Sequence, residues 1–336
     1  MRFALDAEQT EFGHTLGRLL STAEVPATVR SWAAGDFAAG RVLWRRLAAA
    51  GVFALAVPEE YAGLGRLPVE LAVACEELGR YAVPGPVVET VAGAMLLGAL
   101  AGHGKAARAA AEEWLPRIAD GRAMVTLGAP EAGPYVLDAE AADTALVYDG
   151  RRLFAGAGCG PARRSVDPAR RLHRPGPGGL LLAVGAAPAA AVRDAGDWAA
   201  FATAAQCLGV GLALLERTVE HVRRRTQFGR PIGSFQAVKH RLADVLIDLE
   251  FTRPLLYGAA VALAAGAPTA GAEVAAAKAA AGEAVYRAAR AALQLHGAIG
   301  YTQELDLSLW LGKARALRGA WGAPGRCRAR ALAGLV

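Results

Sequence analysis

Residues 223–249 read RRRTQFGRPIGSFQAVKHRLADVLIDL, and this stretch decides how the rest of the chain is interpreted. The leading arginines suit the end of one helix, because cations interact favourably with a helix C-terminus. Gly229, Pro231 and Gly233 then interrupt the helical pattern. Ser234 stands where the N-cap of a second helix is expected. That helix is predicted from apolar residues at spacings of three and four, which are Phe235, Val238, Leu242, Val245, Leu246 and Leu249.

The turn between the two helices gathers an arginine, an amide and an aromatic ring at one corner. These groups suit a ligand that carries a phosphate and a flat ring, since a guanidinium can hold two phosphate oxygens at once. The same spacing also fits an ordinary helical hairpin with a solvated basic turn. Spacing alone therefore leaves both interpretations open.

The motif Arg-x-Gln-Phe-Gly-Arg-Pro-Ile-Gly-x-Phe-Gln, followed by Leu-Ala-Asp, resembles the signature of the acyl-CoA dehydrogenase family. A second resemblance to this family lies near the N-terminus, in Gly-Val-x-Ala-Leu-x-Val-Pro-Glu at 51–59, Gly-Leu-Gly at 63–65 and Glu-Glu-Leu-Gly-Arg at 76–80. The resemblance implies an FAD-dependent flavoprotein with a helical N-terminal domain, a small β domain and a C-terminal four-helix bundle.

Composition narrows the class of protein. The chain has 336 residues, of which 54% are hydrophobic, so it can bury a sizeable core. Its net charge of +6 is mild and its arginines are scattered, which argues against nucleic-acid binding. Neither the spacing of the histidines nor that of the cysteines suggests a metal site, and no apolar run reaches the length of a membrane span. The start of the chain lacks the apolar region of a signal peptide, and widely spaced cysteines favour a reduced, cytoplasmic protein.

Three units are expected along the chain, and they make a mostly α protein with a small β domain. Residues 1–119 read as helical, starting with a capping box at Asp6 and Gln9. Residues 120–196 contain short β-prone runs separated by Gly, Pro and Asp, and form a middle β domain shorter than the family's. Residues 197–336 read as a helical bundle with short loops. Helices are expected at 38–50, 68–80, 87–101, 105–118, 235–250, 252–265 and 272–296, and strands at 123–127, 144–148, 151–154 and 180–184.

The resemblance also assigns cofactor contacts, with FAD placed at the bundle and shared between subunits. Gln294 to Gly297 match the family's Gln-x-x-Gly-Gly turn, in which Ala298 replaces the second glycine. A backbone that approaches a phosphate closely favours a residue without a Cβ, so this change weakens the turn. His296 is interpreted as a turn histidine with a local hydrogen bond. The implied FAD contacts are Arg225, Gln227, Phe228, Gln236, Gln294, Leu295, His296, Gly297 and Ala298.

The catalytic base is missing from both positions that the resemblance indicates. The implied reaction removes a proton alpha to a thioester while a hydride leaves the beta carbon, and a positioned carboxylate must take that proton. The family's glutamate corresponds either to Gly322, in the segment Trp321-Gly322-Ala323-Pro324, or to Ala199. Asp197 lies two residues from the second position and is a weak candidate.

Three hypotheses follow from a retained signature and an absent base. The chain is one subunit of a heteromeric acyl-CoA dehydrogenase whose partner supplies the base, a stand-alone flavoenzyme with altered chemistry, or a non-catalytic scaffold without FAD. The first is preferred. The implied partners are an acyl-CoA or acyl-carrier thioester and a homologous chain, in a homo- or hetero-oligomer that is a dimer or a tetramer.

Overall fold

The computed structural model describes residues 4–334, apart from the side chain of Glu131. Its N-terminal part is helical, and the capping box predicted at Asp6 and Gln9 is confirmed at the start of the first helix. Short 3-10 turns at Ala54–Ala56 and Glu59–Tyr61 join the third helix to the fourth. The helices are α1 (Ala7–Ser21), α2 (Val25–Ala34), α3 (Ala38–Ala49), α4 (Pro68–Arg80), α5 (Val87–Leu100) and α6 (Lys105–Ala119).

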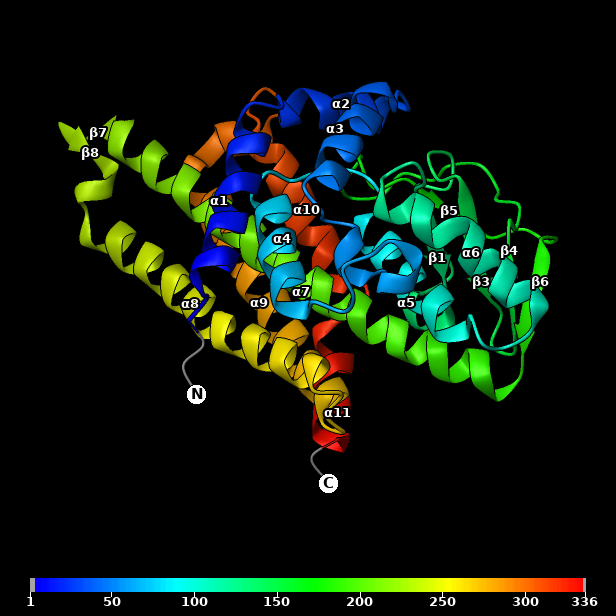
Figure 1. Cartoon of the computed structure of the whole chain (residues 1–336). Coiled ribbons are helices and arrows are strands. Elements are labelled where there is room, and N and C mark those ends of the chain that lie inside the picture. The colour runs from blue at the N-terminus through cyan, green and yellow to red at the C-terminus, as the bar shows by residue number, and fades with distance from the viewer. Residues whose placement is uncertain (1–3, 335–336) are drawn as a thin grey trace.

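A small β region follows, at the right of Figure 1. Its four-stranded sheet has the order β1-β3-β4-β6, in which β1 and β3 are parallel and the other pairs antiparallel. The short strands β2 and β5 form a separate antiparallel pair. The strands are β1 (Val125–Gly128), β2 (Val136–Leu137), β3 (Thr144–Tyr148), β4 (Arg152–Ala155), β5 (Leu172–His173) and β6 (Leu180–Val184).

The C-terminal part is a helical bundle around one central helix. α9 packs against α7, α8, α10 and α11, and α7 also packs against α4 and α5 of the N-terminal part. The two-residue strands β7 (Thr226–Gln227) and β8 (Arg230–Pro231) form a hairpin between α7 and α8. The helices are α7 (Ala186–Arg224), α8 (Gln236–Ala264), α9 (Ala270–His296), α10 (Leu307–Gly319) and α11 (Pro324–Ala333).

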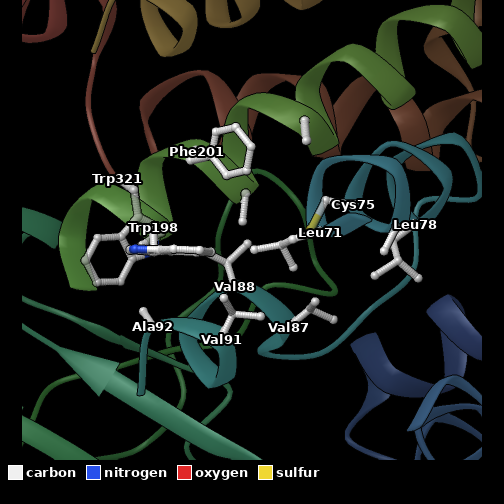
Figure 2. Close-up of a cluster of buried hydrophobic side chains, with 14 of the residues drawn as sticks. Leu71, Cys75, Leu78, Val87, Val88, Val91, Ala92, Trp198, Phe201 and Trp321 are labelled. Carbon is white, nitrogen blue, oxygen red and sulfur yellow. The ribbon is translucent and has the colours of Figure 1, made fainter. Parts of the chain in front are cut away.

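Small residues allow α4 and α7 to cross closely. A Cβ added to Gly209 of α7 would lie 1.8 Å from the carbonyl oxygen of Glu76 in α4, so only glycine fits there. The buried cluster in Figure 2 extends from this crossing. Trp198 and Phe201 of α7, Leu71 of α4 and Val88 of α5 all lie in it, together with Trp321 from the segment after α10. The core is therefore continuous from the N-terminal helices into the bundle.

Among the described residues, one helix is long and apolar enough to span a membrane, but it is a core helix. In α7, 94% of the most apolar 18-residue window is buried inside the protein. Neighbouring helices already cover that apolar surface, so the length and composition of α7 give no reason to place it in lipid.

Several predicted boundaries are wrong. Residues 235–265 form one helix, α8, and not two, because Leu249, Thr252 and Leu256 bury against the bundle on both sides of Pro254. Ser234 does not cap this helix. Its hydroxyl donates to the carbonyl of Pro231 at 2.7 Å, and Phe235 occupies the N-cap position.

Two helices, α2 and α11, were not expected from the sequence, and α7 begins earlier than predicted. The boundary placed at 196/197 falls within α7 because the helix continues from the bundle back to Ala186, beside the β region. The helix has 39 residues and therefore belongs to both units that it connects.

Candidate functional site

The hairpin β7–β8 projects from one end of the bundle, at the upper left of Figure 1. Arg225, which directly follows α7, and Gln227 are exposed, and Phe228 is 90% exposed at the tip with a left-handed φ of 53°. Arg230 lies over the ring of Phe235, with the guanidinium carbon 4.1 Å from the ring centroid. Aromatic and cationic groups are thus presented outward, although apolar rings are normally buried.

A pocket of about 530 Å³ lies beside this hairpin, and we call it the corner pocket. It brings Arg225, which follows α7, together with His296 at the end of α9, although the two are distant in sequence. Three arginines and three acidic residues line it, so charges of both signs face its space. The lining consists of Arg217, Glu220, His221, Arg224, Arg225, His296, Glu304, Leu305, Asp306 and Leu307.

The two histidines of the corner pocket stack on each other, with ring centroids 4.1 Å apart. Nδ1 of His296 lies 2.8 Å from the carbonyl oxygen of Ala292, to which it donates, as expected for a turn histidine. Burial lowers the pKa of His296. Burial also lowers the pKa of His221, and the nearby charges of His296 and Arg225 lower it further. Both rings are therefore uncharged at neutral pH, and the cationic groups of the pocket are its arginines.

The remaining residues assigned to FAD are distributed around the same end of the bundle. Gln236 is exposed at the start of α8, and Gln294 accepts a hydrogen bond from Arg241. Leu295 is half-buried, whereas Gly297 and Ala298 are exposed. Gln227, Phe228 and Gln236 do not line the corner pocket, so the structure unites only part of the predicted set.

A second pocket, of about 230 Å³, lies between the β region and the end of α10, and we call it the interdomain pocket. Strand residues form its apolar wall, and small residues of α10 form the opposite wall. Its lining consists of Glu89, Leu127, Ala132, Tyr135, Leu137, Ser165, Arg170, Leu172, Ala316, Gly319, Ala320 and Trp321.

Sequence reasoning missed the central residue of the interdomain pocket. Glu89 of α5 is only 3% exposed and accepts a hydrogen bond from Nε1 of Trp321 at 3.0 Å. Nη2 of Arg170 lies 3.8 Å from the same oxygen of Glu89. The sequence does contain a feature that points to this residue, because Glu89 is the one charged residue in the apolar helix at 87–100. Arg170 lies between β4 and β5, so this contact joins the β region to α5.

Neither position of the family's base carries a carboxylate, although Gly322 lines a pocket of about 280 Å³. Gly322 has a left-handed φ of 133°, and a Cβ there would lie 2.5 Å from Sγ of Cys327. The carbonyl of Gly322 also accepts a hydrogen bond from Nζ of the buried Lys278 at 3.0 Å. Ala199 is fully buried inside α7, and Asp197 forms an ion pair with Arg330 of α11.

Within residues 4–334, no group of three or more His, Cys, Asp or Glu side chains could hold a metal ion.

Family models for the acyl-CoA dehydrogenase N-terminal and C-terminal domains match residues 6–122 and 190–329. The chain belongs to the acyl-CoA dehydrogenase family. It is 35% identical over 311 residues to acyl-CoA dehydrogenase IpdE2 of Mycobacterium tuberculosis, and the match covers 91% of each chain. The resemblance and the fold class predicted from the sequence are thereby confirmed.

Solved structures give the same result. The ChsE4-ChsE5 complex from Mycobacterium tuberculosis contains a chain that is 26% identical, with a TM-score of 0.84 over 100% of this chain and 99% of that one. Butyryl-CoA dehydrogenase from Megasphaera elsdenii, at 21% identity, shares the fold, with a TM-score of 0.85 over the full length of both chains. The protein is an acyl-CoA dehydrogenase-like flavoprotein, and the cofactor of its family is FAD.

The exposed residues of the hairpin fit FAD chemically. Arg225 offers a guanidinium for the diphosphate and Gln227 an amide. Phe228 offers a ring that is 90% exposed and meets the ring of Phe235 edge to face, with centroids 6.2 Å apart. The Cβ of Ala298 is no obstacle, because this residue faces solvent. The donor set therefore suits the diphosphate and adenine end of the cofactor.

Proposed function

We propose that this chain is the base-lacking subunit of a heteromeric acyl-CoA dehydrogenase, which acts on an acyl-CoA or acyl-carrier thioester. The observation that carries the proposal is the contrast between two sites. The groups proposed for the diphosphate and adenine are exposed, whereas neither position for the base carries a carboxylate, since Gly322 and Ala199 stand there and Ala199 is fully buried. A homologous partner subunit would supply the carboxylate.

The residues proposed to hold FAD are those of the hairpin and of the turn after α9. Arg225 would hold the diphosphate, with Gln227, Phe228 and Gln236 near the adenine end. Gln294, Leu295, His296, Gly297 and Ala298 would form the adjoining wall. FAD, when bound, supplies the acceptor for the hydride that leaves the acyl chain.

The distance between the hairpin β7–β8 and the interdomain pocket supports a cofactor that is shared between subunits. The resemblance places the flavin ring between the loop at 126–133 and the segment after Trp321, where the interdomain pocket lies. Trp198 packs beside Trp321 in Figure 2. At 1.5 Å per residue, α7 extends roughly 40 Å from Trp198 to Arg224, farther than one FAD molecule reaches. The hairpin would therefore bind the cofactor whose ring lies in another subunit.

An apolar face on α8 supports association with a homologous chain. Ile247, Phe251 and Leu255 are 51%, 73% and 45% exposed at spacings of four residues, so they lie on one side of the helix. Exposed apolar stripes of this kind mark surfaces that another chain covers. The similar ChsE4-ChsE5 structure is itself a complex. We propose that α8 forms part of the corresponding interface here.

We also propose the division into residues 1–119, 120–196 and 197–336 as structural units, with α7 continuous across the second boundary, and a cytoplasmic location. Four free cysteines among the described residues support a reducing compartment. The stand-alone alternative with Asp197 as base has less support, because Arg330 holds that carboxylate. The scaffold alternative leaves the exposed groups at Arg225 and Phe228 unexplained.

The experiment is an absorbance spectrum and a native mass, measured on the protein alone and on the protein co-expressed with a homologue that carries the family's glutamate. Flavin absorbance and a mixed assembly that appear only on co-expression are expected, with one flavin per pair of unlike chains. Stoichiometric flavin on a homo-oligomer of this chain would contradict the proposal and return the search for a base to this chain.

A further inference from the structure

A third pocket, of about 420 Å³, lies beside α2, the helix near the top of Figure 1, and we call it the α2 pocket. Three segments that are distant in sequence form it, namely α2, the loop at 164–169 and the start of α10. It shares no lining residue with the corner pocket or the interdomain pocket, so it is separate from the sites proposed for FAD. Its volume is in the range of pockets that bind small molecules.

The charged groups that line the α2 pocket are paired, with one exception. Arg30 forms an ion pair with Asp306. Oδ2 of the buried Asp167 lies 3.6 Å from Nζ of Lys313, and its Oδ1 accepts a hydrogen bond from a backbone N–H of the same loop. Arg164 is exposed, and within residues 4–334 its side chain has no ion pair and no hydrogen bond. The pocket therefore carries one positive charge that the protein does not compensate.

Two neutral donors line the same space as Arg164. Gln303 is exposed and Ser308 is half-buried, and within the described part of the chain neither side chain makes a hydrogen bond. An amide N–H and a hydroxyl can both donate. A guanidinium, an amide and a hydroxyl that are accessible and unused suit an anionic group, which accepts several hydrogen bonds at once.

The rest of the α2 pocket offers apolar contact. Val29 is buried, whereas Ala33 and Leu309 are half-buried. Val166 lines the pocket as well and is 61% exposed, which is unusual for an apolar side chain. A ligand with an apolar body would remove this surface from water and so gain free energy of binding.

We propose that the α2 pocket binds a monocarboxylate with an apolar body. Its carboxylate accepts hydrogen bonds from Arg164, Gln303 and Ser308, while its body packs against Val29 and Val166. One uncompensated cation matches a monoanion, and the planar guanidinium matches the two oxygens of a carboxylate.

The test compares each acid with its neutral amide. The pair 2-naphthoate and 2-naphthamide represents a flat ring, and the pair octanoate and octanamide represents a chain. Binding to the full chain, in the assembly in which it is purified, is measured by calorimetry at low ionic strength. No flavin and no thioester enters the measurement, so its outcome is independent of the experiment that tests the proposed function.

The carboxylate of at least one pair is expected to bind about fivefold more tightly than its amide, as for an exposed ion pair, and the preference should shrink as salt is added. A pocket without a free cation would favour the amide, because a carboxylate loses more hydration on binding. Arg164→Gln keeps a donor but removes the charge, and should abolish the preference. The pair that shows the preference identifies the shape of the ligand's body.

Arg163→Gln is the matched control, because Arg163 is exposed and adjacent in sequence but does not line the α2 pocket. It changes the net charge by the same amount and should leave the preference at the wild-type value. The proposal is overturned by equal affinities within both pairs or by absence of binding for all four ligands. A preference that survives in Arg164→Gln, or that Arg163→Gln removes equally, would also overturn it.

Discussion

At the scale of single residues, Asp138 carries the prediction for the pH dependence of stability. Burial raises the pKa of Asp138 from 3.8 to about 7, although the backbone N–H of Arg171 donates to its carboxylate at 3.0 Å. The folded state thus binds this proton more tightly than the unfolded state. The stability from this group is complete below about pH 4 and is lost as pH rises to 7.

Asp138→Asn should therefore stabilise the protein at pH 8 by up to about 4 kcal/mol and have little effect near pH 4. Asparagine retains an acceptor for the Arg171 N–H and tolerates the left-handed φ of 51° at this position. Urea unfolding at pH 4.5, 6 and 8 measures the effect. Asp149→Asn is the control, because Asp149 is exposed and hydrogen bonds from Arg151 and Arg152 lower its pKa. A gain at pH 8 no larger than that of the control would contradict the assignment.

Arg225 carries the residue-scale prediction for the cofactor. Arg225→Ala removes a charge-assisted contact to phosphate worth about 1.5–3 kcal/mol, which corresponds to roughly 10- to 150-fold weaker FAD binding. Flavin content of the purified assembly and FAD titration measure it. Arg223→Ala is the matched control, since Arg223 is exposed nearby but does not line the corner pocket. Equal flavin retention in the two variants would exclude the role given to Arg225.

At the scale of elements, α8 tests how this chain associates. Phe251→Glu places a charge at the centre of the apolar face formed with Ile247 and Leu255. The assembly should dissociate, and native mass spectrometry should show a smaller species with unchanged helical content. Leu64→Glu, at an exposed leucine before α4, should leave the mass unchanged. An intact assembly in Phe251→Glu would show that this face is not an interface.

Element-scale prediction from the sequence succeeded where the signals are local. The helices at 68–80 and 105–118 and the strands at 144–148 and 180–184 agree with α4, α6, β3 and β6, because periodicity and turn residues determine them. The prediction failed at α8, where burial against α9 keeps the helix continuous through Pro254. It also failed at α11, whose ten residues show mainly a basic, polar pattern. Tertiary packing decides such cases, since local propensity is a weaker influence.

At the scale of the whole molecule, the sequence determined the family, the helical character of both ends and the absence of a glutamate at Gly322 and Ala199. Each of these features depends on a short sequence motif that can be compared with the family's motif position by position. The sequence also indicated the arginine, amide and aromatic groups of the turn between α7 and α8. Glycine and proline residues mark this segment as a turn, and the structure forms it as the hairpin β7–β8.

Only the tertiary structure decided what surrounds the missing base. The hydrogen bond from Trp321 to Glu89 joins residues 232 positions apart, and no local pattern specifies it. The ion pair of Asp197 with Arg330 arises in the same way, from helices α7 and α11, which meet only when the bundle packs. A glutamate alone in an apolar helix signalled a buried carboxylate, but which charge and which pocket it meets depends on the folded arrangement of α5, α10 and the β region.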